Sequence, residues 1–237
     1  MNIAIILAGG MGTRLGGEIP KQYIQVKDRP VIAYCLDNFI DNDIIDAIQI
    51  VADHAWHDLI RQCIEETGFS YKWKGFSAPG ANRQLSVFHA LEDIMVYADA
   101  ESYVMIHDAA RPLVKKEFIK ECFAKAEKYD GVMPVLSMKD TVYLSLDGKS
   151  VTSLLDRERI FAGQAPEVFK LGAYFNANKA LLPDKILSIK GSTEPAVMAG
   201  LNIAMIAGDE ENFKITTQED LERFRQKISG WHSAVAK

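Results

Sequence analysis

The residues with the clearest chemical meaning stand near the start of the chain, in a glycine-rich segment that follows an apolar run. The run Ile3-Ala4-Ile5-Ile6-Leu7-Ala8 indicates a buried strand, and Gly9-Gly10-Met11-Gly12-Thr13-Arg14-Leu15-Gly16 indicates a loop whose backbone closely approaches a ligand. Backbone N–H groups in such a loop can bind phosphate, and Arg14 and Lys21 place positive charge beside them. The segment therefore predicts a binding site for a nucleoside triphosphate.

The spacing of these residues differs from two widespread phosphate-binding patterns. A P-loop is excluded because no Gly-Lys-Ser/Thr sequence follows the glycines. The dinucleotide fingerprint is not met either, because Gly16 comes one residue too late and Arg14 lies inside the turn. A cationic side chain at this point suits a triphosphate better than the pyrophosphate of a dinucleotide, which a helix N-terminus binds.

Three further positions carry polar side chains beside predicted strands or helices. Asp108 ends an apolar strand and can bind a divalent cation or a ribose hydroxyl, although a turn or helix-cap role fits equally. Gly80-x-x-Arg83-x-x-Ser86 begins a predicted helix, whose free N–H groups could read a base edge or simply be capped. Lys214 stands alone in a short apolar run, where a lysine by itself would be expected to reach solvent.

Composition narrows the class of protein. A formal net charge of −5 argues against nucleic acid and anionic membranes as partners, and no apolar run reaches the roughly 20 residues of a membrane helix. Cys35, Cys63 and Cys122 are odd in number and widely spaced, so we expect reduced, structural cysteines and a cytoplasmic location. No Ser-His-Asp or Cys-His arrangement stands out, which argues against covalent catalysis.

Strand-like and helical patterns alternate over the first 137 residues. The expected strands are 2–8, 45–52, 70–76, 102–107 and 131–137, and the expected helices are 31–40, 55–67, 83–97 and 115–128. This alternation predicts an α/β fold with a parallel sheet, helices on both faces and ligands outside the carboxyl ends of the strands. At this length we expect one domain, residues 1–237.

The pattern changes between residues 139 and 164. Two alternating stretches flank Asp147-Gly148, a hairpin signal, and a two-stranded ribbon is marginal alone in water. We therefore expect a protruding β-arm at about 139–164 that packs against a second subunit. Beyond it we expect helices at 170–181 and 193–200, a strand pair at 202–207 and 212–216, and a last helix opened by a capping box at Thr217 and Asp220.

Five motifs occur in order along the chain: Gly-Gly-x-Gly-x-Arg-x-Gly with Pro20-Lys21-Gln22, residues 107–112 (His-Asp-Ala-Ala-Arg-Pro), Asp140-Thr141, Arg157 with residues 163–166, and residues 211–217. Together they resemble the cytidylyltransferases that activate 2-C-methyl-D-erythritol 4-phosphate and their sister group acting on ribitol 5-phosphate. The resemblance runs nearly end to end. It implies a Rossmann-like nucleotidyltransferase fold, a three-layer sandwich with a mostly parallel sheet, and a homodimer formed through the β-arm.

The same resemblance implies CTP and a polyol phosphate as substrates, Mg²⁺ as cofactor and pyrophosphate as product. By residue, it implies catalytic roles for Arg14, Lys21 and Lys214, and acceptor contacts from Thr141 and Arg157. Nucleotide binding is expected from Leu7, Ala8, Gly9, Gly10, Gly12, Gly80, Arg83, Ser86 and Asp108, with Asp108 also the expected metal ligand.

Several positions depart from the family pattern and leave the acceptor open. Ala81 stands where an acidic residue is frequent, residues 164–167 read Gln-Ala-Pro-Glu rather than Gln-Thr-Pro-Gln, and residues 192–195 read Ser-Thr-Glu-Pro rather than Thr-Asp-Glu-Ala. Another polyol phosphate, such as glycerol phosphate, is one alternative. A nucleotidyltransferase for another base, a nicotinamide dehydrogenase and a non-catalytic nucleotide-binding protein are the others.

Overall fold

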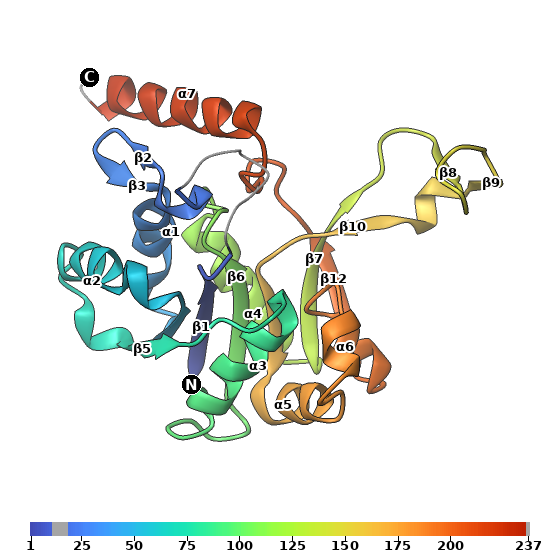
Figure 1. The fold of residues 1–237 in the computed structure, drawn as a ribbon, viewed down its shortest axis with the longest axis horizontal. Helices are drawn as coiled ribbons and strands as arrows, with labels where there is room; N and C mark the ends of the chain where they lie inside the picture. The colour runs from blue at the N-terminus through green and yellow to red at the C-terminus, as the bar shows by residue number, and fades with distance from the viewer. Residues whose placement is uncertain (11–18, 236–237) are drawn as a thin grey trace.

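The computed structural model describes residues 1–10 and 19–235 and has a mixed, mostly parallel sheet at its centre (Figure 1). Its described strands, from one edge, are β5 (Trp73–Ser77), β4 (Ala47–Val51), β1 (Asn2–Leu7), β6 (Tyr103–Asp108), β11 (Glu167–Lys170) and β7 (Gly131–Ser137), with β10 (Phe161–Gly163) and β12 (Ile203–Ala207) also paired to β7. β5, β4, β1 and β6 pair in parallel, and β11 is antiparallel to both β6 and β7. The parallel part therefore places four carboxyl ends at one edge of the sheet.

Helices cover both faces of this sheet, so the predicted three layers are confirmed. The described helices are α1 (Val31–Ile40), α2 (His57–Glu65), α3 (Arg83–Ile94), α4 (Lys116–Ala126), α5 (Leu171–Lys179), α6 (Glu194–Met198) and α7 (Gln218–Val235), with 3₁₀ turns η2 (Lys21–Tyr23), η3 (His54–Trp56), η4 (Ser70–Lys72), η5 (Arg157–Arg159) and η6 (Lys185–Ser188). Along β1, Ala4 and Ile6 pack with α1, α2 and α4, whereas Ile3 and Ile5 pack with α3 and α5. Side chains of a strand alternate between faces, so a strand buried on both sides is apolar throughout.

The order of elements agrees with the sequence prediction, with three differences. Residues 212–216 were expected to form a strand, and this expectation is wrong: the segment crosses the strand ends, where Ile215 N donates to Ala110 O at 2.9 Å. β11 was missed because Pro166, which has no N–H to donate to a ladder, directly precedes it. A short ribbon of β2 (Gln25–Val26) and β3 (Arg29–Pro30) was also missed.

The expected β-arm projects from the body of the molecule (Figure 1). β8 (Val142–Leu144) and β9 (Ser153–Leu155) form its antiparallel ribbon, and Asp147 Oδ1 accepts hydrogen bonds from Lys149 N and Ser150 N, both at 2.8 Å. Leu146 and Leu154 are 81% and 65% exposed. The arm therefore carries apolar surface that the rest of its own chain leaves uncovered.

Two observations bear on the cysteines and on membranes. Cys35, Cys63 and Cys122 are buried free thiols. Burial raises the pKa of the Cys63 thiol to about 11, which keeps it protonated and unreactive near neutral pH. Across the part of the chain that the structure describes, no helix combines the length and apolar character that crossing a bilayer requires.

Candidate active site

A cavity of about 670 Å³ opens at the carboxyl ends of β1, β4, β5 and β6. Its lining residues are Leu7, Gly9, Gly10, Lys21, Gln22, Val51, Asp53, Pro79, Gly80, Ala81, Asn82, Arg83, Ser86, Asp108, Ala110, Lys214 and Thr216. Most predicted nucleotide-binding residues therefore meet at one place, although they come from distant segments. Ala8 is buried beside this wall, and Gly12 and Arg14 lie outside the described residues.

Asp108, at the end of β6, is surrounded by three cations. Arg83 Nε lies 3.1 Å from Asp108 Oδ1, and Lys214 Nζ and Arg111 Nε lie 3.0 and 3.5 Å from Oδ2. Burial alone would raise the pKa of this carboxyl, but the three cations outweigh burial and hold the pKa well below its usual range. Asp108 therefore stays ionised and fixes the positions of Lys214 and Arg83 at the cavity.

Arg83 connects this centre to two further elements. Its guanidinium donates to Ser192 Oγ, just before α6, and lies 3.9 Å from Glu167 Oε2 at the start of β11. Burial raises the pKa of Glu167 to about 7, although the charge of Arg83 acts in the opposite direction. Arg83 thus points toward carboxylates and a hydroxyl of its own chain, rather than standing free to contact a base.

Arg111 was missed as a site residue, although it lies inside the motif 107–112. Its Nη1 donates to Asn212 O at 2.8 Å, in addition to the contact with Asp108. The signal that could have found it is an arginine three residues after a strand-ending aspartate. It ties the end of β6 to the segment that carries Lys214.

Close backbone approach explains the glycines at the two sides of the cavity. A Cβ on Gly9 would lie 2.7 Å from Pro79 Cβ, and a Cβ on Gly80 would lie 2.7 Å from the backbone carbon of Leu85. Gln22, which follows Lys21 in η2, donates through Nε2 to Ala8 O at 2.6 Å and to Gly10 O at 2.8 Å. The end of β1 is therefore held by side chains as well as by the sheet.

The loop before α3 is held by its own polar side chains. Gly80 N donates to Ser86 Oγ at 2.8 Å, and the Ser86 hydroxyl donates to Asn82 O at 3.0 Å. Asn82 caps the helix, since its Oδ1 accepts from Leu85 N at 2.8 Å. The capping alternative is thus confirmed, with Asn82 as the capping residue that the sequence reasoning missed.

Buried hydrogen bonds hold the segment that carries Lys214. Asn212 Nδ2 donates to Ala165 O at 2.7 Å, and Gln164 Nε2 donates to Asp209 O at 2.9 Å. This lysine does not simply reach solvent, because its ammonium pairs with Asp108. After it, Thr217 and Asp220 exchange hydrogen bonds and open α7, which confirms the capping box.

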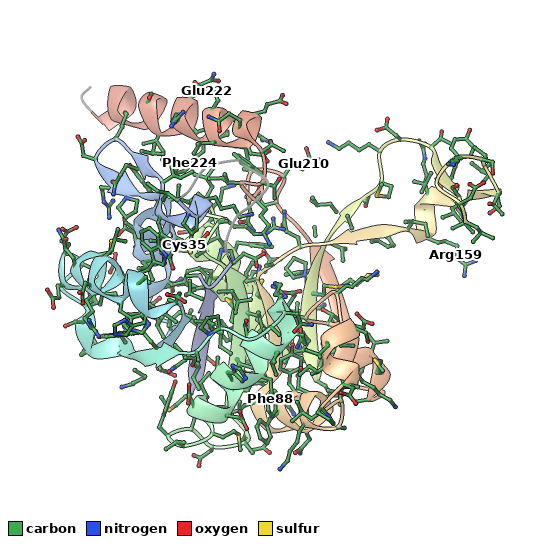
Figure 2. The ribbon with its side chains drawn as sticks, in the orientation of Figure 1. Cys35, Phe88, Arg159, Glu210, Glu222 and Phe224 are labelled. Atoms are coloured by element: carbon green, nitrogen blue, oxygen red, sulfur yellow. The ribbon has the colours of Figure 1, made fainter. Side chains whose placement is uncertain are left out.

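The two predicted acceptor residues lie outside this cavity. Thr141 directly precedes β8, and Arg157, in η5, donates through Nη1 to Lys139 O at 3.0 Å. Figure 2 labels Arg159, from the same turn as Arg157, out on the arm and well away from the strand ends. Within a single chain, Thr141 and Arg157 are therefore not brought to the described cavity lining.

The described cavity residues are compatible with a metal ion whose ligands are mainly phosphate oxygens. Among the described residues no group of three or more His, Cys, Asp and Glu is arranged to hold a metal. Mg²⁺ is commonly bound by one or two carboxylates together with substrate phosphates, and the ionised Asp108 supplies one such carboxylate. Within the described residues, this donor set is too small for an ion bound by protein alone.

Comparison with known proteins gives a consistent result. Residues 2–227 match a family model described as IspD, 2-C-methyl-D-erythritol 4-phosphate cytidylyltransferase. A ribitol-5-phosphate cytidylyltransferase of Streptococcus agalactiae is 30% identical over 95% of this chain and 94% of that protein. A 2-C-methyl-D-erythritol 4-phosphate cytidylyltransferase of Thermotoga neapolitana is 33% identical over 98% of both.

Solved structures share the fold. The crystal structure of 4-diphosphocytidyl-2C-methyl-D-erythritol synthase from Anaerococcus prevotii superposes with a TM-score of 0.82. Its sequence is 24% identical, and the match covers 97% of this chain and 96% of that one. The Rossmann-like nucleotidyltransferase fold expected from the sequence is confirmed.

Proposed function

This chain belongs to the 2-C-methyl-D-erythritol 4-phosphate cytidylyltransferase family, and from that premise we propose that its cavity transfers CMP from CTP to a small polyol phosphate. Pyrophosphate is the second product. Members of the family are cytidylyltransferases, so neither a nicotinamide dehydrogenase nor a non-catalytic binding protein is favoured. The observation that carries the proposal is the convergence of Lys214, Arg83 and Arg111 on Asp108 at the cavity.

The chemistry requires positioning and charge rather than a general base. A phosphate oxygen of the acceptor is already ionised and attacks the α-phosphorus of CTP, while the bond from that phosphorus to pyrophosphate breaks. Negative charge spreads over the phosphoryl oxygens, and preorganised cations lower its energy. Lys214 is preorganised by Asp108, and Lys21 lines the same cavity.

We propose that Mg²⁺ enters with the triphosphate and that Asp108 contributes one of its oxygen ligands. The support is the carboxylate of Asp108 on the cavity wall, where a triphosphate would lie. When bound, such an ion neutralises charge on the phosphate oxygens. Lys214, Arg83 and Arg111 supply fixed charge in the same region.

We also propose a homodimer in which the arm of each subunit reaches the other subunit's cavity. The support is the exposed apolar surface of the arm, including Leu146 and Leu154, together with the absence of Thr141 and Arg157 from the described lining of their own chain's cavity. A two-fold assembly would bury that surface and bring both residues to a cavity at once. The guanidinium of Arg157 suits the acceptor phosphate because it can donate two parallel hydrogen bonds.

The proposed location is the cytoplasm. Buried free thiols at Cys35, Cys63 and Cys122 suit a reducing compartment, because disulfides form and persist in oxidising ones. Fractionation of cells that express the native chain, followed by detection with a specific antibody, tests this location.

Pyrophosphate release with CTP tests the function and also selects the acceptor. Separate reactions contain 2-C-methyl-D-erythritol 4-phosphate, ribitol 5-phosphate, erythritol 4-phosphate or glycerol 3-phosphate. Release that requires CTP and one of the first two acceptors is the expected result. Equal release without any acceptor, or no release with any of them, would contradict the proposed function.

A further inference from the structure

We propose that Glu167 is a positioning residue that keeps Arg83 from taking both carboxylate oxygens of Asp108. The second oxygen then stays with Lys214. This inference rests on the proposed function, since Lys214 is the lysine expected to stabilise charge on the transferred phosphate. Glu167 was not among the predicted site residues, and it is absent from the cavity lining that the described residues form. It acts on the site through Arg83.

The two oxygens of Asp108 have different partners. Arg83 Nε donates to Oδ1 at 3.1 Å. Oδ2 lies 3.0 Å from Lys214 Nζ and 3.5 Å from Arg111 Nε. An arginine and a carboxylate frequently pair through two parallel N–H···O bonds, which would occupy both oxygens. Arg83 donates only one such bond to Asp108, so its other N–H groups must be held elsewhere.

Both terminal nitrogens of Arg83 point to other partners. Nη1 donates to Ser192 Oγ, and the Tyr174 hydroxyl donates to Ser192 O at 2.7 Å, which fixes that serine. Nη2 lies 3.9 Å from Glu167 Oε2. Nε–H and the neighbouring Nη2 form one edge of the planar guanidinium. Asp108 therefore holds one end of that edge, and Glu167 attracts the other.

The sheet places Glu167 near Asp108, on the face that α3 covers. Glu167 in β11 pairs with Ile106 in β6, two residues before Asp108, and directly paired residues share a face. Ile106 packs with Val87 of α3. The Glu167 side chain is 11% exposed, and its buried Oε2 accepts no hydrogen bond from the described residues. A buried oxygen without a donor is costly, so the positive edge of the guanidinium is drawn toward it.

Loss of this attraction would change the partners of Asp108. Nη2 could then approach Oδ2, and Arg83 would pair with both oxygens. Lys214 would yield its place, because an ammonium on a flexible four-carbon stem makes a point contact, whereas the guanidinium fork matches the carboxylate. A phosphate in the cavity would meet a lysine that has to reorient as charge develops, and this reorientation raises the barrier.

The test compares Glu167→Met and Glu167→Gln in the full-length enzyme at pH 8, above the pKa of about 7 to which burial raises the Glu167 carboxyl. Methionine is apolar and of similar length, and an apolar side chain frequently replaces a buried charge without loss of stability. Glutamine keeps an acceptor oxygen. We expect kcat to fall roughly 10-fold in Glu167→Met and less than about threefold in Glu167→Gln, with little change in the KM for CTP.

Two further variants and a structure show whether the effect runs through Lys214. In a Lys214→Ala background, Glu167→Met is expected to change kcat by less than about twofold, because the lysine it helps to hold is gone. Glu121→Met changes an exposed glutamate on α4, outside the cavity lining, and should keep the wild-type kcat. A crystal structure of Glu167→Met should show Arg83 Nε and Nη2 on the two oxygens of Asp108.

The outcomes separate the inference from the function on which it rests. If the wild type is a cytidylyltransferase and Glu167→Met keeps kcat within about twofold, the inference is overturned and the function stands. A loss of roughly 10-fold that persists in the Lys214→Ala background also overturns it, because the effect is then independent of the lysine. If the wild type releases no pyrophosphate, the proposed function fails, and the crystal structure still decides the contact: Arg83 on one oxygen of Asp108 in Glu167→Met overturns the inference.

Discussion

Lys214 Nζ lies 3.0 Å from Asp108 Oδ2, which joins a segment near the C-terminus to the end of a central strand. The Asp108 side chain is 10% exposed and the Lys214 side chain 31%, so the ammonium is the more accessible of the two charged groups. A phosphate entering the cavity meets a lysine that is already oriented. This arrangement makes the charge of Lys214 useful for catalysis, because no reorganisation is needed when charge develops.

Lys214→Ala and Lys21→Ala are each expected to lower turnover far more than they weaken CTP binding. Removing one donor directed at developing charge typically lowers the rate on the order of 10²- to 10³-fold. Pyrophosphate release gives kcat, and calorimetry with CTP gives the dissociation constant. Arg14→Ala, in the glycine segment, is expected to reduce both binding and rate.

Lys120→Ala is a control for loss of a positive charge, because Lys120 is exposed on α4 and outside the cavity lining. It should retain full turnover. A Lys214→Ala or Lys21→Ala enzyme with more than about half of the wild-type rate would show that the lysine is structural.

Glu167→Gln is expected to change how stability depends on pH. Because burial raises the folded-state pKa of Glu167 from 4.5 to about 7, its favourable contribution is present below the unfolded pKa and is lost as pH rises through 7. The neutral glutamine has no such loss. Between pH 5 and pH 8 the wild type should lose up to about 3 kcal/mol of unfolding free energy relative to the variant. Urea denaturation at both pH values measures the difference, and equal shifts in the two proteins would refute the raised pKa.

Gly9→Ala is expected to destabilise the fold by about 1–3 kcal/mol, because the new Cβ would approach Pro79 Cβ to 2.7 Å and the proline ring cannot move aside easily. Gly10→Ala is a matched control next to it, since a Cβ on Gly10 meets no heavy atom within 4 Å among the described residues. Thermal unfolding of the two variants measures the difference. Equal stability would mean that the β1 and β5 loops can separate at little cost.

Mixing Arg157→Ala with Lys21→Ala is expected to restore activity that neither variant has alone. In the proposed dimer, a mixed pair has one cavity with an intact Lys21 and an intact Arg157 of the partner subunit. Random exchange would make about a quarter of all cavities complete. Pyrophosphate release after verified subunit exchange measures the recovery, and Arg159→Ala, from the same 3₁₀ turn, is the control that should stay active alone. A monomer in solution, or no recovery, would exclude the shared site.

Elements with a strong local pattern could be predicted from the amino-acid sequence. Ile3 to Ile6 are apolar at every position because both faces of β1 are covered, and the capping box at Thr217 and Asp220 follows from spacing alone. Asp108 could be placed because a carboxylate that ends a buried strand falls at the ligand-binding edge of a parallel sheet. These features depend on residues close together in the chain, so they can be predicted from the local sequence pattern.

Which distant residues share the site could be learned only from the fold. Lys214 was expected at the site only through a family resemblance, and Arg111 was missed. The path of residues 212–216 across the strand ends depends on the buried anchor from Asn212 to Ala165, a contact between segments far apart in sequence. Local pattern reports which side chains are apolar and where a helix begins. The partners of a charged side chain depend instead on which distant segments the fold brings together, because Coulomb energy and burial act through space and not along the sequence.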